Sequence, residues 1–348
     1  MYLYANLDFE YELACKGHYI PARPILGVCR AWSRILRLLD GATEADYFDW
    51  EPGSKLSPNP SGNFIPWGVT PTVKKHLRTP EKFPTVKAVR DVNSKVFSHR
   101  LEQALGLSLP GSCLITSLDE LKLAVHQCPS DWVLKHPLGV GGRERCLGHQ
   151  GELLQSAENW VRKRLEAGWT LVFEPWIYNS KEFSYHFDVH QEGGYQYHGH
   201  TELWTGNDGS YQGNLVSREE NPGAPDWADR LCQSISEAGY WGPVGVDSMT
   251  NRPIMELNAR YSFGRMALEL GRHIPPEWTY AWWQPKREDV KIIQQQASEF
   301  PQGKSWSQGL YRLPDFLGQP PAFVLVAGSA EELTRERGRL IRSQEAEC

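Results

Sequence analysis

The stretch that decides the fold runs from residue 242 to residue 260 and reads GPVGVDSMTNRPIMELNAR. Two strand-like runs flank a turn at Asn251, which predicts a pair of adjacent strands. Residues two apart on a strand share a face, so Asp247, Glu256 and Asn258 are expected to lie side by side. Mg²⁺ prefers such hard oxygen ligands and takes few of them from protein, because phosphate oxygens and water complete its octahedron. The stretch therefore predicts a magnesium site.

A second motif combines a lysine on a strand with a glycine-rich turn. The run VLKHP ends at Pro137 and leads into GVGGR, which contains Gly139, Gly141 and Gly142. Lys135 could hold phosphate oxygens as a point charge, and the glycines would let backbone N–H groups approach a triphosphate. The spacing matches neither a P-loop nor GxGxxG before a helix. An ordinary glycine-rich hairpin is the alternative.

A third motif, FEPWI followed by Glu182, has the features of a site for a nucleoside. Glu174, with the backbone at Trp176 and Ile177, offers a strand edge that can pair with adenine, and a second acid can accept hydrogen bonds from ribose hydroxyls. The alternative is a hairpin with exposed glutamates.

Together these motifs resemble the ATP-grasp superfamily, in which two α+β lobes close over ATP and a carboxylate is activated as an acyl phosphate. The resemblance spans residues 93 to about 271. It implies an α+β (α/β) ATP-grasp fold in which a small N-terminal α/β lobe precedes two α+β lobes that clasp ATP. The expected parts are an N-terminal lobe at 1–92, a small lobe with the glycine-rich loop at 93–177, a large lobe with the metal site at 178–285, and a strand-helix extension at 286–348.

The resemblance also implies ligands and their residues. ATP and Mg²⁺ are the expected cofactors, with two ions and Mn²⁺ as a possible substitute. The implied residues are Lys95 and Lys135 for the phosphates, Gly139, Gly141 and Gly142 for the covering loop, Glu174, Trp176 and Ile177 for adenine, Glu182 for ribose, and Asp247, Glu256 and Asn258 for the metal.

Arg260 matches the arginine that many members carry two residues after the metal-binding asparagine, where it stabilises negative charge in the transition state. Some members carry another arginine two residues before the aspartate, but that position is Gly245 here. Oxyanion stabilisation is therefore expected from Arg260 or Arg265.

The expected function is an ADP-forming, ATP-dependent ligase that joins a small-molecule carboxylate to an amine or similar nucleophile. Three alternatives stay open: a peptide or protein tail as acceptor, a carboxylation-type reaction, and a catalytically silent nucleotide-binding scaffold or sensor. The basic residues Arg143 and Arg145 on the hairpin, and His198 and His200 on a later strand, could line the cleft or be solvated.

The net charge of −5 and the pI of about 6.1 argue against a protein that works by neutralising nucleic-acid phosphates. Acidic residues near the start and the lack of a long apolar run predict neither export nor a membrane anchor. The seven cysteines include no CxxC pair. A cytoplasmic protein is expected, and a homodimer is possible.

Local signals predict several elements. Asn93 or Ser94 should cap a helix from Lys95 that Gly106 ends, and Ser117 begins a capping box. Three runs at 170–177, 182–190 and 195–205 suggest an antiparallel meander.

Overall fold

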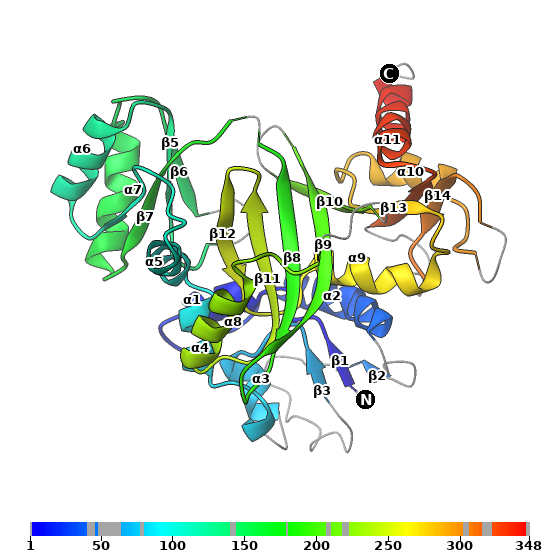
Figure 1. Ribbon diagram of the computed structural model, residues 1–348, viewed down its shortest axis with the longest axis horizontal. Helices are drawn as coiled ribbons and strands as arrows, with labels where there is room; N and C mark the ends of the chain where they lie inside the picture. The colour runs from blue at the N-terminus through cyan, green and yellow to red at the C-terminus, as the bar shows by residue number, and fades with distance from the viewer. Residues whose placement is uncertain are drawn as a thin grey trace.

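The computed structural model describes residues 2–39, 46–47, 64–76, 80–139, 144–178, 180–206, 210–217, 223–301, 306–314 and 322–345. Gly141 and Gly142 of the predicted phosphate loop lie outside these residues. Figure 1 shows a large central sheet with a smaller α/β layer below it and a separate small lobe at its left.

The N-terminal part has a three-stranded parallel sheet in the order β2-β1-β3. Its main elements are β1 (Tyr2–Tyr4), α1 (Phe9–Ala14), α2 (Arg23–Trp32), β2 (Asp46–Tyr47), β3 (Phe64–Pro66), α3 (Pro71–His76) and α4 (Val86–Val92). Phe9, Leu13 and Trp67 are buried in the same apolar cluster as residues of the central sheet. This lobe is therefore fixed to the sheet by a shared core.

The small lobe has an antiparallel sheet in the order β4-β7-β5-β6. Its elements are α5 (Lys95–Leu105), β4 (Cys113–Ile115), α6 (Leu118–Gln127), β5 (Trp132–Lys135), β6 (Arg145–Gly148), α7 (Gln155–Glu166) and β7 (Leu171–Pro175). Leu121 of α6 and Val161 of α7 are fully buried with Trp132 and Phe173 of the sheet, so the two helices cover one face of it.

The large sheet has eight antiparallel strands in the order β12-β11-β8-β9-β10-β13-β15-β14. The strands are β8 (Glu182–Val189), β9 (Tyr195–Thr205), β10 (Tyr211–Val216), β11 (Gly242–Met249), β12 (Arg252–Asn258), β13 (Thr279–Trp283), β14 (Gly309–Arg312) and β15 (Phe323–Ala327). The helices are α8 (Ala228–Glu237), α9 (Phe263–Leu270), α10 (Val290–Gln296) and α11 (Ala330–Glu345). The expected extension at 286–348 contributes β14 and β15 to this sheet, and the boundary at 285 stays a prediction.

Helix signals in the sequence agree with the structure. The Ser94 side chain caps α5, Gly106 ends it with φ +71°, and Ser117 and Glu120 form a capping box. The predicted meander is wrong in its first strand, because β7 pairs with β4 and β5 in the small sheet, whereas β8 and β9 pair in the large one.

Helix α5 is docked directly on strand β12 of the large sheet. The Ser98 hydroxyl accepts the Leu257 N–H at 3.2 Å, and the Asn93 amide oxygen accepts the Ala259 N–H at 2.9 Å. Lys95, at the start of α5, is thereby held beside the carboxylates of β12. No helix in the described ranges is both long and apolar enough to cross a membrane.

Candidate active site

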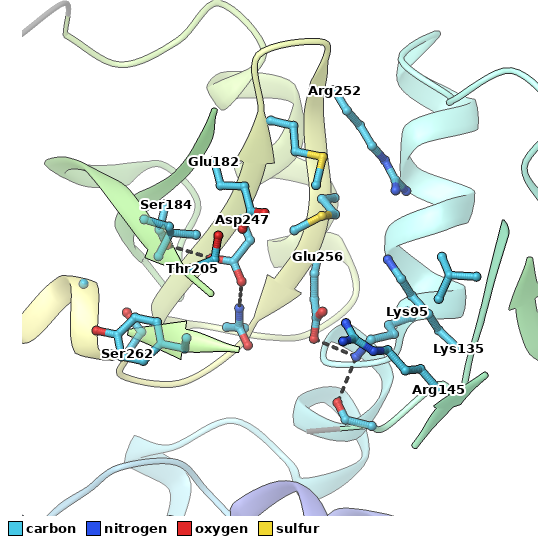
Figure 2. Close-up of a pocket in the computed structure, with 18 of the residues that line it drawn as sticks. Lys95, Lys135, Arg145, Glu182, Ser184, Thr205, Asp247, Arg252, Glu256 and Ser262 are labelled. Atoms are coloured by element: carbon cyan, nitrogen blue, oxygen red, sulfur yellow. Dashed lines mark hydrogen bonds and ion pairs between the residues drawn. The ribbon is translucent and has the colours of Figure 1, made fainter. Parts of the chain in front are cut away.

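A cavity of about 440 Å³ is lined by residues from the N-terminal, small and large lobes. It brings together every described residue predicted for the site except Arg265. These are Lys95, Lys135, Gly139, Glu174, Trp176, Ile177, Glu182, Asp247, Glu256, Asn258 and Arg260. Figure 2 shows Asp247 and Glu256 at its centre, with Ser262 on one side and Lys95, Lys135 and Arg145 on the other.

The predicted metal ligands meet on the β11–β12 hairpin. Asp247 lies directly opposite Glu256 in the register, and Asn258 donates to Asp247 Oδ2 at 2.9 Å. Ser184 of β8 donates to the other oxygen of Asp247 at 2.8 Å. Burial, followed by the negative charge of Glu256, raises the pKa of Asp247 to about 6.

The negative charges of Asp247 and Glu256 lie close together, and a divalent cation between them would stabilise both. Within the described residues there is no cluster of three or more His, Cys, Asp or Glu side chains that could hold a metal ion. Two carboxylates and one amide are too few to surround a metal ion with protein groups alone. They are enough for Mg²⁺, which keeps water and phosphate oxygens as its other ligands. The donor set therefore fits Mg²⁺.

The two predicted phosphate-binding lysines contact carboxylates of the cavity. Lys95 Nζ lies 2.7 Å from Glu256 Oε1 and donates to the Gly139 carbonyl at 2.9 Å. Lys135 Nζ lies 2.5 Å from Glu174 Oε2. Both lysine side chains are mostly buried, with 11 % and 17 % of their surface exposed. Two partly desolvated cations in one cavity suit a polyphosphate.

The apolar wall of the cavity fits a planar base. Trp176 and Ile177, which follow β7, line it together with Val133, Met249 and Met255. The pKa of Glu182 on this side is raised by burial. Glu182 therefore lies where the sequence predicts a ribose-binding acid, but its role stays a prediction.

The environment of Glu174 differs from the one the sequence suggests. Its carboxylate is not an open strand-edge acceptor, because it contacts Lys135 and also accepts from Arg252 at 2.8 Å. Burial alone would raise the pKa of Glu174, but Lys135 and Arg252 outweigh burial and lower it to about 2. Glu174 thus orients two cations. The Trp176 N–H donates to the Asp131 carbonyl at 2.7 Å, so binding of a base by the Trp176 carbonyl and the Ile177 backbone stays a prediction.

Sequence reasoning missed Arg252. This β12 residue is 3 % exposed and makes a bidentate pair with Glu102 of α5, at 2.6 and 2.8 Å. Through Arg252 the small and large lobes share one buried ion network. The sequence shows only that a charged residue lies in a predicted strand. It does not identify the partner, because Glu102 lies 150 positions away.

The ion network predicts a pH-dependent stability. A carboxylate whose folded pKa lies below its usual value stabilises the protein above the unfolded pKa, and this contribution is lost as the pH falls through the folded pKa. Glu174→Gln should therefore lower the free energy of unfolding by roughly 3 kcal/mol at pH 7. The difference from the parent should shrink between about pH 4.5 and pH 2. Urea unfolding over this pH range measures it.

Glu182→Gln is the matched control for that measurement. Burial raises the pKa of Glu182, so removing its charge should leave the stability unchanged or slightly higher at pH 7. A Glu174→Gln protein as stable as the parent at pH 7 would show that the network contributes no net stability.

Arg260 and the N-terminal lobe meet in the same cavity. Arg260 Nε and Nη2 both contact Glu10 Oε1 of α1 at 2.5 Å, and Nη1 donates to the Tyr261 carbonyl at 3.0 Å. The side chains of Arg260 and Glu10 are 16 % and 10 % exposed. Glu10 is a second residue that the sequence did not single out for the site.

The position of Arg265 does not agree with a role in oxyanion stabilisation. Its guanidinium contacts Asp188 at 3.1 Å and Glu269 at 2.8 Å, and the side chain does not line the cavity. Glu269 lies one helical turn along α9, so the helix itself directs Arg265 away. His198 contacts the same Asp188 carboxylate at 2.8 Å. His198, Asp188 and Arg265 therefore form a charged cluster outside the cavity.

Comparison with known proteins gives a match in structure and none in sequence. No family model matches the chain, and no curated protein matches it in sequence. The biotin carboxylase domain of Hydrogenobacter thermophilus 2-oxoglutarate carboxylase, a dimer with MgADP, ADP and bicarbonate, aligns over 97 % of this chain and 83 % of its own, with TM-score 0.55 and 15 % identity.

Two further solved structures are similar. Biotin carboxylase from Campylobacter jejuni, as a β,γ-ATP complex, aligns over 78 % of this chain and 72 % of its own, with TM-score 0.52 and 14 % identity. N5-carboxyaminoimidazole synthetase from Staphylococcus aureus, with ADP, aligns over 80 % and 79 %, with TM-score 0.51 and 9 % identity. These proteins are ATP-grasp enzymes, and this chain has the α+β ATP-grasp fold.

Proposed function

We propose that this chain is an ATP- and Mg²⁺-dependent ligase that activates a carboxylate as an acyl phosphate, releases ADP and joins the acyl group to an amine or similar nucleophile. One observation carries the proposal: a single cavity contains the paired carboxylates Asp247 and Glu256, the cations Lys95 and Lys135, and Arg260. Its fold is that of enzymes crystallised with ADP and MgADP.

When bound, Mg²⁺ and ATP would supply the phosphoryl group and much of the positive charge that phosphoryl transfer needs. Asp247, Glu256 and Asn258 are the residues that would hold the metal. Mn²⁺ would be accepted at the same oxygens. Trp176 and Ile177 would hold the base, and Glu182 the ribose.

The remaining chemistry belongs to groups of this chain. Lys95 and Lys135 would bind phosphate oxygens as fixed cations and hold them in line with the carboxylate. Within the described part of the chain, three of the five N–H donors of Arg260 have partners, which leaves two for an oxygen that gains negative charge. The cavity between the lobes would limit the access of water, which destroys an acyl phosphate.

A screen of nucleotide products tests the proposal. Small carboxylates, with bicarbonate among them, would be offered in combination with amines and MgATP, and ADP and AMP would be measured. Release of ADP that depends on both a carboxylate and an amine is expected. AMP release would contradict acyl phosphate chemistry, and release of ADP with bicarbonate alone would favour a carboxylation. MgATP binding without turnover in any mixture would favour a nucleotide-binding scaffold.

Lys135→Ala should weaken MgATP binding by about one to two decades. A desolvated, charge-assisted contact to phosphate is worth roughly 1.5 to 3 kcal/mol. Calorimetric titration with MgATP measures the change, and Lys122→Ala, an exposed lysine of α6, is the control. A titration of Lys135→Ala that superimposes on that of the parent would remove Lys135 from the nucleotide site.

A further inference from the structure

The part of the cavity beside Arg260 is an aromatic pocket, defined here by Glu10, Trp67, Tyr211, Arg260 and Phe263. All five residues line the cavity. The ring centroids of Trp67 and Phe263 are 5.2 Å apart and those of Phe263 and Tyr211 are 5.6 Å apart, while the Arg260 guanidinium lies 5.9 Å from the Trp67 ring. Residues of the N-terminal lobe and the large lobe thus form one continuous wall.

Glu10 has one carboxylate oxygen in use and one available. Both contacts from Arg260 converge on Oε1, and Oε2 accepts no hydrogen bond from any residue that the structure describes. The side chain is 10 % exposed and lines the cavity, and Oε2 is not among the fully buried polar atoms that lack a partner, so this oxygen is accessible. A carboxylate with one accessible oxygen and no protein donor to it favours a ligand that brings a donor, and a charged donor most of all.

The surrounding rings add a second preference. Trp67, Phe263 and Tyr211 pack against one another and give this part of the cavity an aromatic lining, which favours a planar or apolar body. Two N–H donors of Arg260 have no acceptor among the described residues, and the same guanidinium contacts Glu10. An oxygen atom bound by Arg260 and an amine bound by Glu10 would therefore be neighbours, which is the arrangement that joining them requires.

We propose that the aromatic pocket binds the amine substrate, that Glu10 of the N-terminal lobe recognises its amino group, and that this substrate carries the amine on an apolar, ring-bearing body. This proposal rests on the proposed ligase function, since it names the acceptor of the same site. It gives the N-terminal lobe a role that its sequence does not reveal.

Binding of two matched probes tests the pocket without any turnover. Calorimetry on the full chain saturated with MgADP would compare benzylamine, which is protonated at pH 7, with benzyl alcohol, which has the same ring and no charge. Benzylamine should bind about ten- to a hundredfold more tightly, because it makes a hydrogen bond to a charged group. Methylamine, which has no ring, should bind more weakly than benzylamine.

Glu10→Gln should remove the preference for benzylamine, because the amide keeps one oxygen for Arg260 and replaces the other with an N–H donor. Glu12→Gln is the matched control: Glu12 lies on the same helix, is buried, and accepts the Thr72 N–H at 2.7 Å outside the cavity. Thermal unfolding of both variants shows whether each is folded, and the comparison of probes in the parent needs no variant.

Equal affinity for the two ring-bearing probes, failure of both to bind, or an unchanged preference in folded Glu10→Gln would each overturn the proposal. Failure of the ligase function gives a different result. A chain that binds benzylamine through Glu10 but never releases ADP keeps the amine site and loses the reaction. A chain that releases ADP with amines equally well after Glu10→Gln keeps the reaction and loses this site.

Discussion

Glu256→Gln is expected to fold normally and to lose at least two decades of ADP release. Glu256 lies opposite Asp247 on the hairpin and contacts Lys95, so its carboxylate would contribute both charge and oxygen ligands at the proposed metal position. An amide is neutral and offers one oxygen, and Mg²⁺ binds hard, charged oxygens more strongly. Losing charge stabilisation of this kind costs a phosphoryl transfer most of its rate.

The fold should survive the substitution because Glu256 also destabilises its neighbour. Its negative charge is the second cause of the raised pKa of Asp247. Removing that charge relieves repulsion, which offsets the lost contact with Lys95. Thermal unfolding with and without MgATP, together with ADP release, measures both effects. Glu152→Gln, an exposed change in the small lobe, is the control. A folded Glu256→Gln protein with parental turnover would remove the metal assignment.

The juxtaposition of the proposed metal ligands could be predicted because the three residues are local. Asp247, Glu256 and Asn258 belong to one hairpin, and the side-chain period of a strand fixes which residues share a face. The turn at Asn251 then sets the register, and the structure pairs Asp247 with Glu256. Helix caps at Ser94 and Ser117 were predictable for the same reason, since the groups that they satisfy lie within a few residues.

Contacts between distant segments could not be predicted in this way. Arg252 meets Glu102 and Glu174, which are 150 and 78 positions away, and Glu10 meets Arg260 across 250 positions. A pattern of residue types predicts that a strand or helix forms but does not identify its partner. The prediction of a three-stranded meander was wrong for this reason. Both β7 and β8 are strands, but β7 belongs to the small sheet and β8 to the large one.

The same limit explains the two assignments that the geometry changes. Glu174 has the expected position in the strand, yet two cations from other elements occupy its carboxylate. Arg265 is near Arg260 in sequence, but the direction of α9 turns it toward Asp188 and Glu269. Both residues were assigned to the site because they are close in sequence to other site residues. Which groups each side chain contacts depends on the tertiary structure.

The Arg260→Ala variant distinguishes a role of Arg260 in catalysis from a role in nucleotide binding. If its two free N–H donors contact charge that develops only during phosphoryl transfer or amine attack, Arg260→Ala should lower the saturated rate of ADP release by about two to three decades. The dissociation constant of MgATP should change by much less, because Lys95 and Lys135 remain in place. Calorimetry and the rate at saturating substrates measure the two quantities on the same protein.

Two further variants make the result specific to the guanidinium. Arg260→Lys should rescue poorly, since a point charge cannot reproduce the planar, two-pronged contact that a guanidinium makes. Arg265→Lys is the control, because this nearby arginine lies in α9 outside the cavity, and it should leave the rate near the parental value. Arg260→Ala also leaves the buried Glu10 without a partner, so Glu10→Gln combined with Arg260→Ala tests whether an uncompensated charge causes the loss. A parental rate in Arg260→Ala, or equal losses of rate and of MgATP affinity, would make Arg260 a structural or binding residue. Glu10→Gln alone is the reference for the double variant, because this change also alters the proposed amine site. A rate loss in the double variant that clearly exceeds the loss in Glu10→Gln, with MgATP affinity kept, would assign Arg260 to the transition state.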